Sequence, residues 1–459
     1  MNEEKKLNMF QSLVLLLLII GSVAVCIRLK TGGPMIGLFM SWIIIYLFCK
    51  VLKMDYDKVV SGAYDAIRVV VPTLCLLMAI GVMIGTWLQS GTIASIIVSG
   101  LKMINPTWLL PLTLVFCAVL SLVTGTSYGS VGSAGVAMMA IGNAMGINPG
   151  MVAGAVICGA MFGDKLSPLS DTTNLAPAVA GAKLNDHVRS MLWTTLPTFA
   201  ISLVLFTILG ISQTSGGYEE GNLLVYVDAL QGEFKLGIVT LIPAIVIIVL
   251  LLCKVNAIVS LGLSAVCAGA VSWFCQGATL QSIIRVAYNG YSTQIEEAIL
   301  KTILNRGGMS SMLQYVAIIC FAVGMGGMLD RLGVLENILN AITDRIHSDG
   351  SLILASLLVG YVTSLISCSQ PMSHVLTGNM MKPLFKERKI APEILSRTLE
   401  DAGTLSGPMI PWHGYCVYMA GTLGVAWFAF FPYLFLLYLT PLFSIFYGFT
   451  GISIKHIEE

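Results

Sequence analysis

The sequence predicts an all-α polytopic membrane protein with two inverted structural repeats, broken helices, re-entrant hairpins and roughly 10–12 spans. Three observations support this prediction: an apolar composition, apolar segments of membrane-spanning length, and a set of features that recurs along the chain. Of 459 residues, 56% are hydrophobic and 11% are charged, and the mean hydropathy is +0.86. Soluble domains carry about 25% charged residues, so we expect this chain to lie in a lipid bilayer.

Charge and cysteine usage exclude several other classes of protein. The formal net charge is +1, which gives no basis for a nucleic-acid partner. The 11 cysteines are scattered through apolar segments without the spacing of metal ligands or of a disulfide framework. We therefore expect free, buried thiols and no cofactor.

The apolar segments set the expected number of spans. A helical span needs about 20 mostly apolar residues. Clear spans are predicted at residues 10–27, 34–52, 69–88, 108–123, 192–211, 236–253, 257–275, 312–329, 352–368 and 427–449. Shorter segments, interrupted by Gly, Pro or polar residues, occupy 92–104, 131–147, 151–162, 371–381 and 414–424.

Two halves become visible when the chain is compared with itself at an offset of 243 residues. The offset aligns Leu122 with Leu365, Pro149 with Pro392, Pro168 with Pro411 and Gly181 with Gly424. The basic segment 382–389 aligns with the uncharged segment 139–146, so the halves are expected to face opposite sides of the membrane. Inverted repeats with paired broken helices are typical of secondary transporters.

The predicted organisation follows from this repeat. Residues 1–212 form the first membrane repeat, residues 213–235 an acidic external linker, and residues 236–459 the second membrane repeat. Lys5, Lys6 and the basic segment 382–389 are expected on the inside.

The stretch GDKLSPLSDTTN, residues 163–174, is the most polar part of the first repeat and lies between two short apolar segments. Pro168 removes one amide donor and disfavours helix at Ser167. We interpret the stretch as the unwound middle of a broken helix whose oxygens bind sodium, with an ordinary solvated loop as the alternative. The candidate sodium ligands are Asp164, Ser167, Ser170, Asp171, Thr172, Thr173 and Asn174. Lys165 is expected to neutralise Asp164 or Asp171 when the site is empty.

The second repeat contains a corresponding broken segment at residues 400–414, with Asp401, Thr404, Ser406 and His413 as candidate substrate-binding residues. Two registers are possible: one places His413 opposite Ser170, and the other aligns "LSP" with "LSGP". The spans 108–123 and 352–368 end in small hydroxyl residues, which we interpret as hairpin tips pointing at the breaks. Helix-to-helix packing is the alternative. The polar residues at the two tips are also candidate substrate-binding residues, as is Lys165. The tip residues are Thr124, Thr126, Ser127, Ser367, Ser369 and Gln370.

The motif GDKLSPLSDTTNLA resembles the signature of the NhaC family of sodium/proton antiporters, within the wider ion-transporter superfamily. The resemblance covers nearly the whole chain in length, span pattern and repeat. It implies inverted repeats, hairpins, a homodimer and an elevator-type movement, with exchange of sodium for protons. Some members are thought to couple this exchange to organic acids or amino acids, such as malate against lactate. The motif residues to which the resemblance carries over are Asp164, Lys165, Ser167, Ser170, Asp171, Thr172, Thr173 and Asn174.

We therefore predict a secondary active transporter, not an enzyme, in the cytoplasmic membrane of a prokaryote. Sodium and protons are its expected substrates, and a sodium- or proton-coupled exchanger of a small organic acid or amino acid is the alternative. A channel also fits the composition. An intramembrane aspartyl protease would need Gly-x-Gly-Asp, and "MFGD" at Asp164 lacks the first Gly.

Overall fold

The computed structural model describes residues 6–29, 34–214, 220–337 and 346–457. These residues form helices and a single isolated bridge between Ile390 and His456, with no strand. Among the described residues, eight helices are long and apolar enough to cross a membrane, and the number of spans is up to 11 if each bent helix pair counts as one. The all-α, multi-pass prediction is confirmed.

The described part of the first half of the chain forms ten α-helices and one π-helix. They are α1 (Met9–Arg28), α2 (Pro34–Leu52), α3 (Tyr56–Gln89), α4 (Thr92–Met103), α5 (Pro106–Thr124), α6 (Ser127–Ser130), η1 (Val131–Gly135), α7 (Val136–Ala144), α8 (Pro149–Leu166), α9 (Asp171–Ala180) and α10 (Leu184–Thr214). Within the predicted linker, residues 215–219 lie outside the described residues, and α11 (Glu220–Glu233) follows them.

The second half continues with the same kinds of element. They are η2 (Ile238–Leu241), α12 (Ile242–Leu252), α13 (Ala257–Gln276), α14 (Leu280–Asn289), α15 (Ala298–Leu304), α16 (Met309–Arg331), α18 (Asp349–Ser367), α19 (Gln370–Glu387), α20 (Pro392–Leu399), η3 (Glu400–Thr404), η4 (Gly407–Met409), α21 (Gly414–Leu423), α22 (Trp427–Phe430), η5 (Phe431–Tyr433) and α23 (Phe435–Thr450).

Helix boundaries recur at the offset of 243 residues. The bounds of α5 map onto those of α18, and the bounds of α9 map onto those of α21. The left-handed residue that ends α5 is Gly125, and its counterpart Cys368 ends α18 with φ of 55°. The N-cap of α9 is Ser170 and that of α21 is His413, so the structure selects the register that places these two residues opposite each other.

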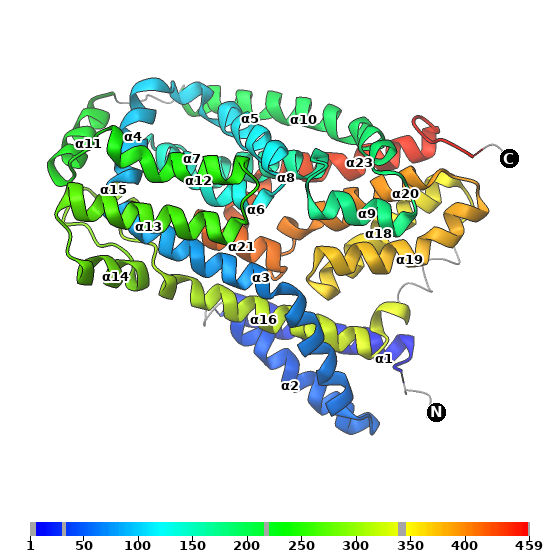
Figure 1. Ribbon diagram of the computed structural model, residues 1–459. Coiled ribbons are helices and arrows are strands. Elements are labelled where there is room, and N and C mark those ends of the chain that lie inside the picture. The colour runs from blue at the N-terminus through cyan, green and yellow to red at the C-terminus, as the bar shows by residue number, and fades with distance from the viewer. Residues whose placement is uncertain (1–5, 30–33, 215–219, 338–345, 458–459) are drawn as a thin grey trace.

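In space the helices form two groups, and each half of the chain contributes to both (Figure 1). Helices α1, α2, α3, α13, α14 and α16 make the first group, in which α3 packs against α16 most extensively. Helices α5 to α10 and α18 to α23 make the second group. A Cβ on Gly62 of α3 would lie 2.5 Å from the carbonyl oxygen of Gly327 on α16, so these two backbones touch.

The ends of the molecule agree with the expected orientation of its loops. Figure 1 shows both chain termini at one end of the helices, with α19 nearby and α11 at the opposite end. The basic segment 382–389 closes α19, so it shares an end with the termini. The acidic α11 lies at the other end, where an external linker was expected.

One predicted span is wrong as a continuous helix. Residues 427–449 divide into α22, the 3₁₀ turn η5 and α23. Pro432 in η5 removes a backbone donor and prevents a continuous α-helix there. Helix α21 meets the α22–η5 segment at 86°, so the chain bends sharply here instead of continuing as one straight helix.

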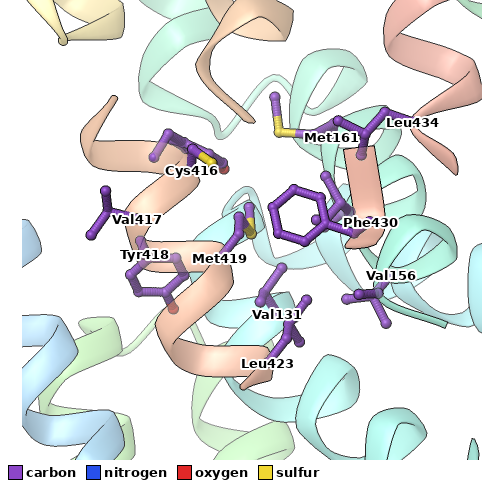
Figure 2. Packing of buried hydrophobic residues seen from close by; sticks show 14 of the residues in the cluster. Val131, Val156, Met161, Cys416, Val417, Tyr418, Met419, Leu423, Phe430 and Leu434 are labelled. Atoms are coloured by element: carbon purple, nitrogen blue, oxygen red, sulfur yellow. The ribbon is translucent and has the colours of Figure 1, made fainter. Parts of the chain in front are cut away.

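Helix α8, which carries the polar stretch, is held by apolar packing on all sides. Figure 2 shows Val156 and Met161 of α8 facing Phe430, and Val131 of η1 beside Leu423 of α21. On the opposite side α8 lies directly against the α5 backbone. A Cβ on Gly159 would lie 2.3 Å from the Leu114 carbonyl oxygen. The glycines of α8 therefore set the depth at which its polar end reaches the centre of the protein.

We predict that Gly163→Val lowers the thermal unfolding temperature by several degrees. A Cβ at Gly163 would lie 2.2 Å from the Ala118 carbonyl oxygen, and overpacking costs about 1–3 kcal/mol. Gly21→Val on α1 is the matched control, because no atom lies within 4 Å of a Cβ there. The measurement is thermal unfolding of purified protein in detergent. Equal melting temperatures for both variants would contradict the close α5–α8 packing.

Candidate functional site

The polar stretch forms a helix break, as the sequence predicted. Helix α8 ends at Leu166, the chain is extended at Ser167, and α9 starts again at Asp171 with a bend of 49°. The Thr173 hydroxyl lies 3.1 Å from the carbonyl oxygens of both Asp164 and Lys165. The Asn174 amide donates to the carbonyls of Pro168 at 2.9 Å and Ser170 at 2.7 Å. The break therefore satisfies its own exposed backbone, which holds it in one shape.

Asp164 is the carboxylate that this break buries. Its side chain is 6% exposed, and the Ser127 hydroxyl donates to its Oδ2 at 2.5 Å. Ser127 also contacts the Tyr415 hydroxyl of α21. The Ser170 hydroxyl interacts with the same carboxylate and lies 3.1 Å from the Thr172 hydroxyl. Asp164 thus lies among hydroxyl oxygens that come from both halves of the chain.

Each helical hairpin touches the break of its own repeat. A Cβ at Gly125, the tip between α5 and α6, would lie 2.5 Å from Leu169 in the first break. In the second repeat the Cys368 carbonyl accepts a hydrogen bond from the Gly414 amide at 3.5 Å, and the indole of Trp412 donates to the Leu365 carbonyl at 3.1 Å. Hairpin tips and broken helices therefore meet in the same way in both repeats.

The second break begins with a π-helical turn. Gln370, at the second hairpin tip, donates to the Thr404 carbonyl at 2.8 Å. The Thr404 hydroxyl lies 3.1 Å from His374 Nε2. His413 caps α21 by accepting the Tyr415 amide on Nδ1 at 3.0 Å, and its Nε2 is buried without a partner. π-helical turns are frequently found at functional sites, and this one carries two adjacent carboxylates.

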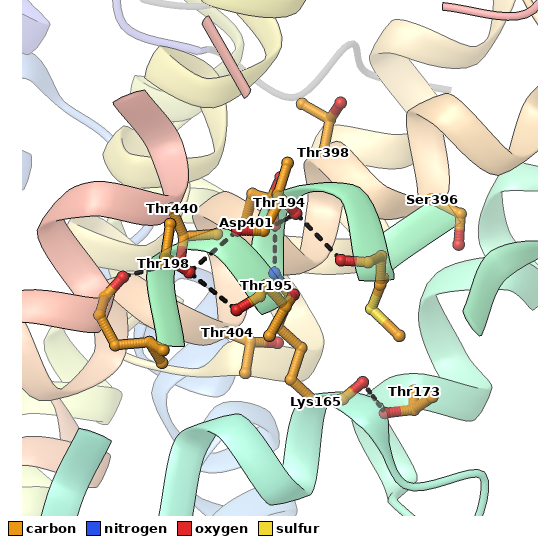
Figure 3. Close-up of polar contacts among 12 residues, drawn as sticks. Lys165, Thr173, Thr194, Thr195, Thr198, Ser396, Thr398, Asp401, Thr404 and Thr440 are labelled. Carbon is orange, nitrogen blue, oxygen red and sulfur yellow. Dashed lines mark hydrogen bonds and ion pairs between the residues drawn. The ribbon is translucent and has the colours of Figure 1, made fainter. Parts of the chain in front are cut away.

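A buried ion pair connects the two repeats. Lys165 Nζ binds Asp401 Oδ1, and both side chains are 0% exposed. The Thr194 hydroxyl of α10 donates to the same Asp401 oxygen at 3.1 Å, as Figure 3 shows. The expected pairing of Lys165 with Asp164 or Asp171 is wrong in this structure, because consecutive helical residues point to different faces, and the Lys165 side chain points toward η3.

The other predicted residues are exposed, bind groups of their own segments, or lack a partner. Asp171 and Asn174 are exposed at the surface of the first break. The hydroxyls of Thr124, Ser367 and Ser406 donate to carbonyls of their own segments, Thr126 caps α6, and the Ser167 hydroxyl accepts the Leu169 amide. The Ser369 hydroxyl is buried without a partner.

Sequence reasoning missed four residues of this cluster: Thr194, Arg397, Glu400 and Tyr415. Arg397 and Glu400 are 0% exposed, and both Glu400 oxygens lack a hydrogen-bond partner. A signal was present, since Arg397 precedes Glu400 by three positions and Asp401 by four, the spacing of one helical face. Thr194 belongs to a stripe of hydroxyl residues repeating every four positions along α10: Ser190, Thr194, Thr198 and Ser202.

The buried charges of the cluster do not balance. Asp164, Glu400 and Asp401 are acidic, whereas Lys165 and Arg397 are basic, and all five side chains are buried. If every group is ionised, the cluster carries one excess negative charge. An uncompensated charge in a low-dielectric interior is costly. One monovalent cation or one proton removes the excess, and the surrounding hydroxyls supply oxygen ligands for a cation.

Paired broken helices, facing hairpins and a buried ionic cluster together define a membrane transporter. The model of the Na⁺/H⁺ antiporter family matches residues 159–452. The chain is 34% identical over 452 residues to the Na⁺/H⁺ antiporter NhaC of Alkalihalophilus pseudofirmus, covering 98% of this chain and 97% of that protein. This chain belongs to the Na⁺/H⁺ antiporter family.

Two further relatives are antiporters of organic solutes. The malate-2H⁺/Na⁺-lactate antiporter of Bacillus subtilis is 36% identical, with 91% of this chain and 89% of that protein covered. The arginine/ornithine antiporter ArcD of Halobacterium salinarum is 33% identical, with 86% of this chain and 82% of that protein covered.

We predict that Asp401→Asn lowers the unfolding free energy by about 3–5 kcal/mol, because it leaves the Lys165 charge buried without its partner. The double variant Lys165→Met plus Asp401→Leu should recover most of this loss. Asp65→Asn is the matched control, since its ion pair with Arg331 is half exposed or more and contributes about 0–1 kcal/mol. The unfolding free energies of Asp401→Asn, the double variant and Asp65→Asn are measured in detergent. A double variant as unstable as Asp401→Asn would contradict the pairing.

Proposed function

We propose that this protein exchanges sodium ions for protons across the membrane by alternating access. The observation that carries this proposal is the burial of Asp164 within a shell of hydroxyl oxygens from both repeats. Asp164 belongs to a buried cluster that would carry one excess negative charge if all its groups were ionised. Sodium is a hard cation that prefers oxygen ligands. Asp164, Ser127, Ser170 and Thr172 are the proposed core of the sodium site. The family membership of this chain and its similarity to NhaC Na⁺/H⁺ antiporters support the same exchange.

Coupling follows from competition at one buried carboxylate. Burial favours the protonated form of a carboxyl group, whereas a bound cation favours the ionised form. Sodium and a proton therefore exclude each other at Asp164. When the cluster is empty and ionised, the transporter changes slowly between its two orientations, because the excess charge has no partner in the apolar interior. Exchange is then obligatory, since only the sodium-bound and protonated forms move.

The remaining predicted residues take supporting roles in this proposal. Thr173 and Asn174 fix the backbone of the first break, and Ser167 ends α8. Asp171 is exposed, so it acts by attracting cations toward the break. Lys165 and Asp401 hold the second break against the first, and Gln370 fixes the Thr404 carbonyl within the second break.

We predict that Asp164→Asn abolishes sodium-driven proton flux in proteoliposomes. The amide carries no charge to neutralise a cation, and losing a charged ligand costs at least about 1.5–3 kcal/mol, a tenfold or larger loss of sodium affinity. The measurement is the internal pH change after a sodium pulse. Sodium should also raise the melting temperature of the wild type and not of Asp164→Asn.

Asp171→Asn is the matched control for this experiment. It makes the same chemical change seven positions along the chain, on an exposed side chain. Because solvent screens that charge, we expect its flux to stay within a few-fold of the wild type. Equal flux from wild type and Asp164→Asn would refute the proposed site.

A second candidate function is exchange of a small organic acid or amino acid coupled to sodium or protons. It is favoured by His413, whose Nε2 is buried beside Gly407 and Gln370 without a partner and could bind a carboxylate. The malate/lactate and arginine/ornithine antiporters among the relatives support it.

Flux with and without added solute separates the two candidates. Sodium-driven proton movement in plain salt solution supports simple exchange. Movement that requires malate, lactate or an amino acid supports the second candidate, and His413→Ala should then weaken the dependence on solute.

The cellular setting is proposed on the same basis. We place the protein in the cytoplasmic membrane of a prokaryote, with the basic segment 382–389 inside, working as a homodimer and without a cofactor. The inverted repeats 1–212 and 236–459 are proposed to alternate access by an elevator-type movement of the second helix group against the first.

A further inference from the structure

A polar cavity of about 410 Å³ opens between the start of α10, the start of α20 and the C-terminal segment. Its lining includes Asp186, Arg189, Ser190, Glu393, Ser453 and Lys455. The C-terminal segment is hydrogen-bonded to the chain beside the basic segment, because the Ala391 amide donates to the Lys455 carbonyl at 2.8 Å. The cavity therefore opens on the side of the membrane that carries residues 382–389.

The hydroxyl stripe of α10 leads from this cavity to the buried ion pair. Ser190 lines the cavity, is 7% exposed, and has no partner for its hydroxyl. Thr194 lies one helical turn deeper and donates to Asp401. Beyond it, the Thr198 hydroxyl lies 3.1 Å from the Thr440 hydroxyl, and Ser202 is 0% exposed. The stripe therefore contacts the cavity at one end and the ionic cluster one turn further.

Arg397 lies between the cavity and the cluster. Its Nη1 donates to the Ser453 hydroxyl at 2.9 Å, and Ser453 is part of the cavity lining. Its Nε and Nη2 are buried without a hydrogen-bond partner. The guanidinium interacts electrostatically with Asp401, so its positive charge is offset where it meets the cluster. Arg397 thus contacts the cavity lining through Ser453 and interacts with the ion pair through Asp401.

Unpaired polar atoms are concentrated along this line. Among the described residues, half of the buried side-chain nitrogen and oxygen atoms without a partner belong to α10 and the α20–η3 segment. They are His187 Nε2, Ser190 Oγ, Thr195 Oγ1, Arg397 Nε and Nη2, both Glu400 oxygens and Asp401 Oδ2. Buried polar atoms are normally paired with protein or with water. Their concentration in these two packed segments is what we would expect of a region that water enters.

We propose that the cavity is the mouth of a hydrated route by which protons and the transported cation reach the Lys165–Asp401 pair and the neighbouring Asp164 site. In this proposal, which rests on the exchange function above, Ser190 and Thr194 line the route and Arg397, held by Ser453, forms its neck. The route serves the side of the membrane that carries residues 382–389.

Cysteine accessibility tests this route directly. Ser190→Cys and Thr194→Cys are treated with a charged, membrane-impermeant methanethiosulfonate reagent from each face of sealed vesicles, and labelling is compared with that of the wild type. Ser202→Cys is the matched control, a buried hydroxyl on the same stripe two turns beyond Thr194. We expect the first two to react from the 382–389 side only, and Ser202→Cys to remain unlabelled from that side.

A change at the neck gives a second measurement. Ser453 has a left-handed backbone with φ of 63°, so Ser453→Gly is compatible with the fold and frees the Arg397 guanidinium. Added to Thr194→Cys, it should raise the labelling rate several-fold. If Thr194→Cys does not yield monodisperse protein, Thr195→Cys takes its place, because that hydroxyl is buried and unpaired.

Two outcomes overturn the route. In one, Ser190→Cys reacts while the deeper cysteine never does, which makes the cavity a closed surface depression. In the other, Ser453→Gly leaves the labelling rate unchanged, which removes Arg397 from the neck. Labelling reports access whatever the substrate is. A labelled Thr194→Cys in a protein without sodium-driven proton flux would therefore reject the exchange function and keep the route.

Discussion

The buried ion pair between Lys165 and Asp401 is the interaction on which the arrangement of the site depends. It joins the end of α8 in the first repeat to the π-helical turn η3 in the second, and both side chains are fully buried. Two opposite charges in an apolar interior must remain together, because separating them leaves each uncompensated. The pair therefore holds the end of α8 beside η3, and each hairpin tip contacts the broken helix of its own repeat.

Each break can lie deep in the protein because its backbone groups are bound by nearby side chains. Unpaired carbonyls and amides at membrane depth cost several kcal/mol each. Thr173 and Asn174 bind the carbonyls freed by the first break, and Gln370 binds the Thr404 carbonyl of the second. These polar residues are structural in the first instance. By holding the backbone, they leave the Asp164 carboxylate and the hydroxyls around it available to a cation.

The sequence predicted the repeat, both breaks and the hairpin tips, because Pro168 and Pro411 disrupt helices by local chemistry and the offset of 243 residues relates them. It did not separate Asp164 from Asp171, which share one motif and differ only in burial. It also missed the partner of Lys165, since Asp401 is 236 positions away and only tertiary packing brings them together. Arg397 and Glu400 were not recognised either, because their burial depends on the packing of α10 and α18 against α20 and η3.

In the proposed mechanism, the excess charge of the cluster determines which forms of the transporter can change orientation. In the proposed exchange, sodium or a proton makes the cluster neutral, and the neutral form can move through the apolar surroundings of the second helix group. The empty cluster would carry one charge, and moving it across 100 mV alone changes its energy by about 2.3 kcal/mol. Desolvation adds to the barrier. The same imbalance that attracts a cation therefore prevents the empty carrier from returning, and this turns competition at one carboxylate into coupled exchange.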